Sequence, residues 1–323
     1  MTLYPLQFQP LFNYRLWGGE KLKTELGKDY SDNNIGESWE ISDVDANETK
    51  VLEGDLKGFS LKQLIKQFKG EFLGQSVYDT FGDAFPLLIK FIDANTPLSV
   101  QVHPNNDVAK TRHNSFGKNE MWFVMQAEKN AELIIGFEEK ITPSQLETHL
   151  KNNTILNVLH KEQVTKGDAF YIPTGRIHAI GGGVMLAEIQ QTSNITYRVY
   201  DYNRVDKTTG QKRDLHIEQA KEVLDFEVYK TYKTNYTKTP NSSNKLIHSP
   251  YFKSNFLKVE GVLEKDYSKL DSFVIYMCVD GDVELTWNDK IYSLKKGETL
   301  LLPASIKNIS LSSTSSELLE VYL

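Results

Sequence analysis

The feature that most constrains the fold of this chain is an internal repeat. Residues 166–173 read KGDAFYIP and residues 296–303 read KGETLLLP, so the two octapeptides match in residue type at each position. An apolar segment typical of a β-strand precedes each copy, at 121–125 and at 273–277. Two copies of one β unit, separated by about 130 residues, predict a duplicated β-barrel.

The two copies differ at the fifth residue after their closing prolines. His178 stands at this position in the first copy and Asn308 in the second. Imidazole is the commonest metal ligand among protein side chains. The first copy therefore keeps a potential ligand that the second copy has lost.

The rest of the chain is also mainly β in pattern. Short segments rich in Val, Ile, Tyr and Phe alternate with turns rich in Gly, Pro, Asn and Asp. Strands are expected at 6–17, 37–42, 120–126, 132–137, 169–173, 184–190 and 196–202. Helices are expected only at about 60–80 and 142–162, where Ser60 and Thr142 are suitable N-caps.

The domain organisation follows from a polar stretch at 230–245, rich in Thr, Asn, Lys and Ser, which indicates a linker. With 323 residues the chain has room for two domains. We expect a domain over residues 1–235 that carries the functional site and both helical segments. A degenerate β domain is expected over 246–323.

Charge and composition narrow the class of protein. The formal net charge of −6 gives no basic footprint for nucleic acid, and no apolar segment approaches the length of a membrane span. The N-terminus lacks the pattern of a signal peptide. The single cysteine, Cys278, lies in an apolar run and is expected to be buried, which fits a reducing compartment. We expect a cytoplasmic protein without nucleic-acid or membrane partners, and the composition leaves the oligomeric state open.

A candidate metal site begins in the segment SVQVHP at 99–104. Gln101 and His103 are two residues apart in an expected strand, so their side chains share one face. Glu120 begins another strand, and His178 follows the first repeat. A lone histidine in a strand is usually structural, but two imidazoles, a carboxylate and a carboxamide form a ligand set for one divalent ion, with zinc the first choice.

The two repeats resemble the strands of the cupin superfamily, which are antiparallel jelly-roll barrels with an internal metal-binding histidine. Within it, four motifs in order resemble type I mannose-6-phosphate isomerases (phosphomannose isomerases), in their short bacterial form. These motifs are PLSVQVHP at 97–104, GKNEMW at 117–122, IPTGRIHAI at 172–180 and YRVYDY at 197–202. The resemblance covers residues 10–206 well and the C-terminal barrel loosely.

The resemblance implies a mainly β fold of two cupin (jelly-roll) barrels with a small helical insertion. It also implies interconversion of mannose 6-phosphate and fructose 6-phosphate, with one zinc ion per chain and a small-molecule sugar phosphate as partner. The positions that match Gln101, His103, Glu120 and His178 form the metal shell of the family. Arg198 matches its catalytic arginine, and Lys118 matches a lysine near the substrate, although the family often has proline at the position of Asn119.

The chemistry of this reaction suits these residue types, but several assignments remain open. Moving a carbonyl between C1 and C2 passes through an enediol(ate), whose negative charge zinc and the guanidinium of Arg198 would stabilise. On spacing alone, Arg198 would instead form a strand-surface ion pair with an aspartate. The candidates for proton transfer are Glu40, Lys118, Asp201 and zinc-bound water. The candidates for binding the phosphate are Lys90, Ser99 and Arg176.

Two rival functions remain at this point. One is another cupin metalloenzyme, such as an iron dioxygenase, whose usual ligand set of three histidines, or two histidines and a carboxylate, is close to the present one. The other is a non-catalytic sugar-binding or regulatory cupin, which would be expected to have a degraded metal shell. The intact ligand set of the first copy and the segment around Arg198 favour the isomerase.

Overall fold

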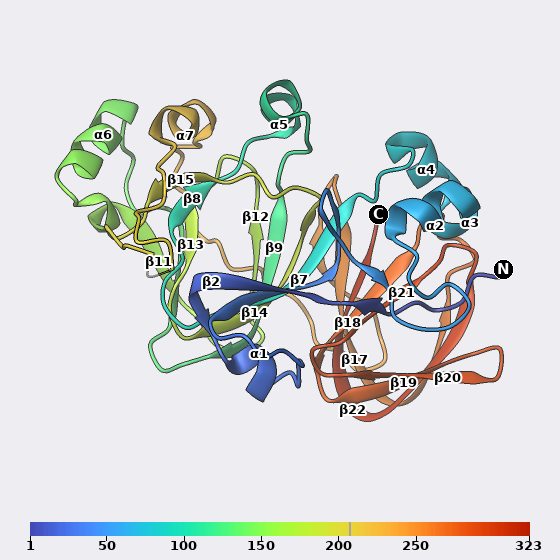
Figure 1. Ribbon diagram of the computed structural model, residues 1–323. Helices are drawn as coiled ribbons and strands as arrows, with labels where there is room; N and C mark the ends of the chain where they lie inside the picture. Colours follow the sequence, from blue (N-terminus) through green and yellow to red (C-terminus); the bar gives the residue numbers. More distant parts are fainter. Residues whose placement is uncertain (207) are drawn as a thin grey trace.

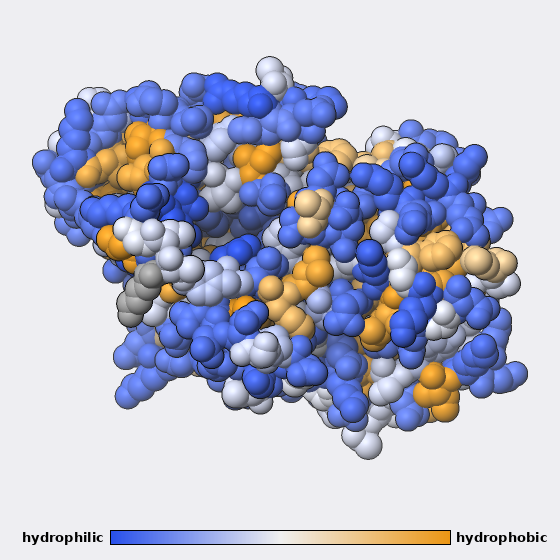
Figure 2. All heavy atoms as spheres, viewed as in Figure 1, coloured by the Kyte–Doolittle hydropathy of each residue, from blue (hydrophilic) through white to orange (hydrophobic). Residues whose placement is uncertain are grey.

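The computed structural model describes residues 1–206 and 208–323 and shows two antiparallel β-barrels side by side (Figure 1). This confirms the predicted mainly β class. Hydrophilic residues cover most of the face seen in Figure 2, and apolar residues appear there in separate small patches. No helix of the described residues has the length and apolar character needed to cross a bilayer.

The first barrel is built from two sheets. A six-stranded sheet has the order β12-β9-β14-β7-β2-β3, and a five-stranded sheet has the order β11-β10-β13-β8-β15. The strands of the six-stranded sheet are β2 (Leu11–Gly19), β3 (Ile35–Ile41), β7 (Leu87–Ala94), β9 (Glu120–Ala127), β12 (Ala169–Ile172) and β14 (Val184–Gln191). Those of the five-stranded sheet are β8 (Val100–Val102), β10 (Glu132–Phe137), β11 (Leu159–Gln163), β13 (His178–Ile180) and β15 (Tyr197–Tyr200). Two short ladders join β1 (Phe8–Gln9) to β6 (Lys50–Val51) and β4 (Asp43–Val44) to β5 (Asn47–Glu48).

The second barrel contains one seven-stranded sheet. Its path is β16-β17-β22-β18-β21, and the hairpin β19–β20 joins it through β22. The strands are β16 (Asn244–His248), β17 (Lys253–Asp266), β18 (Val274–Asp280), β19 (Asp282–Trp287), β20 (Lys290–Lys295), β21 (Thr299–Leu302) and β22 (Asn308–Tyr322). No helix follows residue 246 in the described chain, as the sequence predicted.

The helices lie at the edges of the barrels (Figure 1). They are α1 (Lys21–Thr24), α2 (Leu61–Phe68), α3 (Gly70–Leu73), α4 (Gln75–Phe81), α5 (Asn106–His113), α6 (Pro143–Lys151), α7 (Ile217–Val223) and the 3₁₀ turn η1 (Ile155–Asn157). The region predicted at about 60–80 is helical as α2, α3 and α4, and Ser60 and Thr142 each form a capping box. The region predicted at 142–162 is helical in α6 and η1, but its end was wrong, because residues 159–163 form the strand β11. The helices α1, α5 and α7 were not predicted from the sequence.

The two barrels share a core. Side chains on one face of β14, such as Ile189, pack in the same cluster as Phe256 and Leu319 of the second barrel. The chain before β1 also crosses to the second barrel, where the backbone of Leu6 forms two hydrogen bonds of 2.8 Å with Leu301. The strand β14 is therefore buried on both faces, one toward its own barrel interior and one toward the neighbouring barrel.

Candidate active site and metal centre

Three of the predicted site residues form one row across the five-stranded sheet. Gln101 of β8 lies directly opposite His178 of β13 on one side and Arg198 of β15 on the other. Residues that lie opposite one another on neighbouring strands point to the same face. The register of β8, β13 and β15 therefore brings together an imidazole, a carboxamide and a guanidinium that are up to 97 residues apart in the sequence.

His103 and Glu120 reach the same point from other elements. His103 directly follows β8, and Glu120 is the first residue of β9. The Nε2 atoms of His103 and His178 lie 3.1 Å apart. The carboxylate oxygens of Glu120 lie 3.3 Å from Nε2 of His178 and 3.6 Å from Nε2 of His103. All three side chains are at most 1% exposed.

The backbone fixes which imidazole nitrogens face this group. Nδ1 of His103 lies 2.9 Å from the carbonyl oxygen of Ile195, and Nδ1 of His178 lies 2.8 Å from that of Arg176. Because a carbonyl oxygen can only accept, each Nδ1 carries the hydrogen and each Nε2 presents a lone pair. Two nitrogen lone pairs and one carboxylate therefore converge on one small volume.

The electrostatics of this group favour a bound cation. Burial lowers the pKa of His178 to about 3 and that of His103 well below its ordinary range, so both imidazoles are neutral at physiological pH. Burial also raises the pKa of Glu120 to about 7. Lys118 Nζ pairs with Oε2 of Glu120 at 3.0 Å, and Oε1 faces Nε2 of His178 with no hydrogen-bond donor from a described residue. A buried carboxylate with an oxygen left without a donor, beside two imidazole nitrogens, suits a divalent metal ion.

Gln101 adjoins the same group. Its Nε2 lies 3.4 Å from Nε2 of His178. The oxygen and nitrogen of a carboxamide are assigned from hydrogen bonding, and a flip of the amide would turn the oxygen toward the metal position. Of the predicted ligands, His103, Glu120 and His178 thus form a buried cluster that can bind a metal. Gln101 lies at its edge.

A cavity of about 450 Å³ opens next to this cluster. Gln101, Lys118 and Arg198 all line it, so each of the predicted site residues either belongs to the metal cluster or borders the cavity. Lys118 connects the two, because its Nζ lies 3.2 Å from Nε2 of His103. The cavity is also bordered by Arg15, Trp17, Glu37, Trp39, Lys90, Ser99, Glu188 and Arg213.

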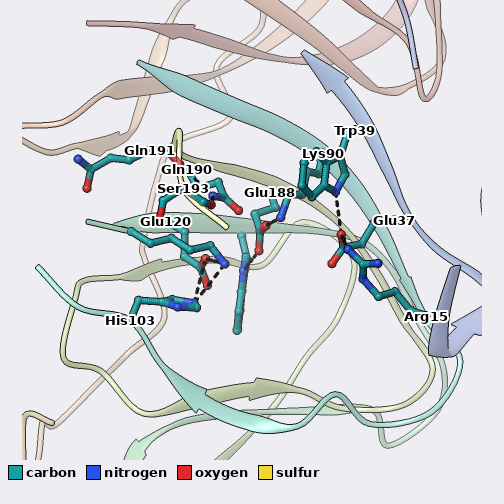
Figure 3. Close-up of polar contacts among 12 residues, drawn as sticks. Arg15, Glu37, Trp39, Lys90, His103, Glu120, Glu188, Gln190, Gln191 and Ser193 are labelled. Carbon is teal, nitrogen blue, oxygen red and sulfur yellow. Dashed lines mark hydrogen bonds and ion pairs between the residues drawn. The ribbon is translucent and has the colours of Figure 1, made fainter. Parts of the chain in front are cut away.

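A second row of side chains lies across the six-stranded sheet (Figure 3). Glu188 of β14 pairs with Lys90 of β7, and both are labelled in Figure 3. On the other side, Glu188 pairs with Trp122 of β9. Glu188 accepts a hydrogen bond of 2.9 Å from the Trp122 indole and forms an ion pair of 3.0 Å with Lys90. Although burial disfavours its charge, Lys90 and Lys118 lower the pKa of Glu188, so it is a carboxylate at neutral pH.

Glu37 and Arg15 extend this row toward the outside. Glu37 accepts hydrogen bonds of 2.7 Å from both Arg15 and the Trp39 indole. Although burial disfavours its charge, Lys90 and Arg15 lower the pKa of Glu37 to about 2. Positive and negative charges therefore alternate along one wall of the cavity.

Glu188 was not among the site residues predicted from the sequence, and Lys90 was predicted only as a cation for the phosphate. Glu188 is the one charged residue of the buried strand Val184–Gln191, and Lys90 lies between apolar residues in Leu87–Ala94, which also contains Asp93. A buried charge needs a partner, so a charged residue in such a mainly apolar strand could have identified both Glu188 and Lys90.

Arg198 does not form the alternative ion pair considered from spacing. Asp201 is instead bound by Arg204 and Arg213, and among the described residues no carboxylate lies within ion-pair distance of Arg198. Its Nη1 donates to the carbonyl oxygen of Asp214 at 2.8 Å, while its buried Nε has no acceptor. The guanidinium thus keeps hydrogen-bonding capacity toward the cavity.

The remaining candidates for proton transfer and phosphate binding differ in whether they border the cavity. Glu40 lies on the opposite face of β3 from Glu37, where it pairs with Lys28 at 2.7 Å, and it does not border the cavity. Asp201 does not border it either. Arg176 stacks on Tyr229, 4.0 Å from its ring centre, outside the cavity. Lys118 and zinc-bound water therefore remain as candidates for proton transfer, and Lys90 and Ser99 remain as candidates for binding the phosphate.

Comparison with known proteins identifies the family. The family model described as phosphomannose isomerase type I, catalytic domain, matches residues 5–133, and that of the mannose-6-phosphate isomerase cupin domain matches 242–323. The chain is 33% identical to mannose-6-phosphate isomerase ManA of Bacillus subtilis over 314 residues, which cover 96% of both proteins. This chain belongs to the mannose-6-phosphate isomerase family.

Other members of the family agree with this assignment. The mannose-6-phosphate isomerase of Streptococcus mutans is 35% identical over 311 residues, covering 94% of each chain. The crystal structure of the B. subtilis mannose 6-phosphate isomerase superposes with a TM-score of 0.89 at 28% identity and covers 99% of both chains. The resemblance and the cupin fold inferred from the motifs are confirmed. The family favours an isomerase over the dioxygenase and the non-catalytic sugar-binding protein.

Proposed function

We propose that this chain interconverts mannose 6-phosphate and fructose 6-phosphate in the cavity bordered by Lys118 and Arg198. The observation that carries this proposal is the buried convergence of two imidazole lone pairs and the Glu120 carboxylate beside that cavity. The names of full-length relatives support the same reaction.

We propose that one zinc ion per chain binds to Gln101, His103, Glu120 and His178. Two nitrogens and a carboxylate oxygen are ligands that Zn²⁺ commonly takes, and a weak fourth ligand leaves room for substrate. When bound, the ion would act as a Lewis acid that stabilises negative charge on a sugar oxygen.

The residues of the cavity supply the rest of the chemistry. A proton must leave the carbon next to the carbonyl, and negative charge then develops on two oxygens. Arg198 and Lys118 would hold that charge as fixed cations in a site with little water. The ionised carboxylate of Glu188 is the cavity group proposed to accept the proton from one carbon and return it to the neighbouring carbon. The ammonium of Lys118 would donate its proton to the carbonyl oxygen and regain one from the hydroxyl that becomes the new carbonyl.

The sugar phosphate requires further cations, which Lys90 and Arg15 provide along the cavity wall. In this proposal residues 1–235 form the catalytic unit, and residues 246–323 form a degenerate barrel. A cytoplasmic location is also part of the proposal, because the single cysteine, Cys278, is buried and free.

The experiment that tests the function combines an isomerase assay on mannose 6-phosphate with metal analysis of the purified protein. We expect His178→Ala and Glu120→Ala to lose both activity and metal while remaining folded by circular dichroism. His248→Ala, an exposed histidine of the second barrel, is the matched control and should keep both. Full turnover in either ligand variant would refute the metal-dependent mechanism.

A further inference from the structure

Asn119, the residue between Lys118 and Glu120, is buried and forms several hydrogen bonds to neighbouring loops. Asn119 is 2% exposed and uses all of its polar groups. Its backbone N–H and its Nδ2 donate to Oε1 of Gln191 at 3.1 and 2.8 Å. Its Oδ1 accepts from the Tyr171 hydroxyl at 3.2 Å and from the backbone N–H of Thr174 at 3.1 Å.

These contacts join the three loops that hold the metal cluster. Thr174 lies in the turn between β12 and β13, which leads to His178. Gln191 ends β14, and the loop after it provides the Ile195 carbonyl that accepts from Nδ1 of His103. Asn119 itself directly precedes Glu120.

The network also extends to the helix α5. The Nε2 of Gln191 donates at 3.1 Å to Oδ1 of Asn106, which accepts the backbone N–H of Gly117 at 2.9 Å. A side chain at Gly117 would lie 2.7 Å from backbone atoms of Asn105 and Asn106, so the loop that carries Lys118 packs closely on the start of α5.

We propose that Asn119 is a positioning residue that sets the geometry of the metal cluster by holding these three loops together through Gln191 and Thr174. This inference rests on the metal site proposed above. Its physical basis is that ligand geometry depends on the hydrogen bonds that hold the ligand-bearing backbone, and loss of such bonds typically weakens metal affinity about 10- to 100-fold.

The test measures binding of Co²⁺ alone to the metal-free protein, both as a dissociation constant in competition with a chelator and as the visible spectrum of the bound ion. We expect Asn119→Ala to weaken Co²⁺ binding about 10- to 100-fold and to change the spectrum, which reports the coordination geometry. Gln191→Met removes the acceptor of both Asn119 donors at similar size and should act in the same direction. The double variant should bind no more weakly than the weaker single variant, because both substitutions break one unit.

Asn244→Ala is the matched control. Asn244 is a 5% exposed asparagine of the second barrel that also has hydrogen bonds on both ends of its amide. The variant Asn244→Ala should lose thermal stability, as Asn119→Ala does, but it should bind Co²⁺ with the affinity and spectrum of the wild type.

If Asn119→Ala is destabilised yet binds Co²⁺ with wild-type affinity and spectrum, the role is structural only and the inference is wrong. If Asn119→Ala does not fold, wild-type Co²⁺ affinity in Gln191→Met overturns it equally. A wild-type protein that binds no Co²⁺ would instead refute the metal site of the proposed function, and the inference with it.

Discussion

At the scale of single residues, the position of Arg198 decides what its charge can do. It shares a row with His178 and Gln101, borders the cavity and has a buried Nε without an acceptor. Burial and the nearby Arg213 lower the pKa of Arg198 from its ordinary value, because both make the charged form of the guanidinium less favourable. Such unpaired cations are typical of sites that receive an anion or developing negative charge.

We therefore expect Arg198→Ala to reduce kcat about 10²- to 10³-fold, the usual loss when one fixed charge-stabilising donor is removed. Metal content should stay unchanged, because Arg198 does not belong to the cluster of His103, Glu120 and His178. Arg198→Lys keeps the positive charge but loses the planar guanidinium with its two parallel donors, so its kcat should lie between that of the wild type and that of Arg198→Ala. Steady-state kinetics and metal analysis check both variants, and metal loss with unchanged kcat per bound ion would assign Arg198 a structural role.

Glu37 gives a prediction about pH. Lys90 and Arg15 overcome its burial and lower its pKa from 4.5 to about 2. Between these values the unfolded chain binds more protons than the folded one, so the stability from Glu37 is present above pH 4.5 and is lost as the pH falls toward 2. The shift corresponds to about 3 kcal/mol.

Glu37→Gln keeps an acceptor for the Trp39 indole but removes the charge. We expect its free energy of unfolding to be lower than that of the wild type by about 2–3 kcal/mol near neutral pH, with a gap that narrows below about pH 4. Urea unfolding at several pH values measures this gap, with Glu264→Gln on the exposed part of β17 as the control. A gap that stays constant with pH would show that the ion pairs of Glu37 do not contribute.

At the scale of elements, the two barrels repeat the same strand register. In the first, Trp122 of β9 pairs with Glu188 of β14, which pairs with Lys90 of β7. In the second, Tyr276 of β18 pairs with Glu320 of β22, which pairs with Asn255 of β17.

The repeat has kept the buried glutamate but not the cavity. Glu320 is 2% exposed and is bound by Lys265 at 2.7 Å and by Asn255 at 2.8 Å. Apolar residues such as Val274, which corresponds in register to Glu120, fill the interior. The glutamate of the second barrel is therefore satisfied within the protein, whereas that of the first faces a cavity.

This comparison predicts that restoring one ligand cannot restore a site. His178→Asn should lose the metal, while the reciprocal Asn308→His should gain none, because Asn308 is exposed and Val274 stands where a carboxylate is needed. Metal content per chain, measured after saturation with Zn²⁺ and gel filtration, distinguishes the variants. A second equivalent of metal in Asn308→His would show that the second barrel has kept a usable site.

The sequence could predict what depends on short spacing. The repeat, the alternation of Gln101 with His103 and the fifth residue after the proline are all local patterns, and they led to residues that the structure brings together. Glu188 and Lys90 could not be paired in this way, because their contact depends on the register between β14 and β7, almost 100 residues apart. The helix α5 was not predicted because most of its residues are polar and Ala109 is its one buried residue, so its sequence has no apolar face with helical spacing.

At the scale of the whole molecule, the two barrels do not have separate cores. Phe123 of β9 stacks on Phe256 of β17 with ring centres 6.0 Å apart, and both belong to one buried cluster. The helix pair α2–α3 also crosses between the units, because the backbone N–H of Phe273 donates to the carbonyl oxygen of Leu73 at 3.0 Å. Exposing either barrel alone would uncover this shared apolar surface, which costs free energy in proportion to its area.

We therefore expect the chain to unfold as one cooperative unit. Trp17, Trp39 and Trp122 report on the first barrel in a Trp287→Phe background, and Cys278, buried in β18 and the sole cysteine, reports on the second through its reactivity with a thiol reagent. Both signals should change at the same urea concentration.

Phe256→Ala should lower the free energy of unfolding by about 3–5 kcal/mol and shift both transitions to lower urea concentration together. The control Ile291→Ala, at a 63% exposed position, should shift neither transition. Labelling of Cys278 at a urea concentration that leaves the first barrel folded would mean that the second barrel opens alone, and the shared core would then be an interface between two independent domains.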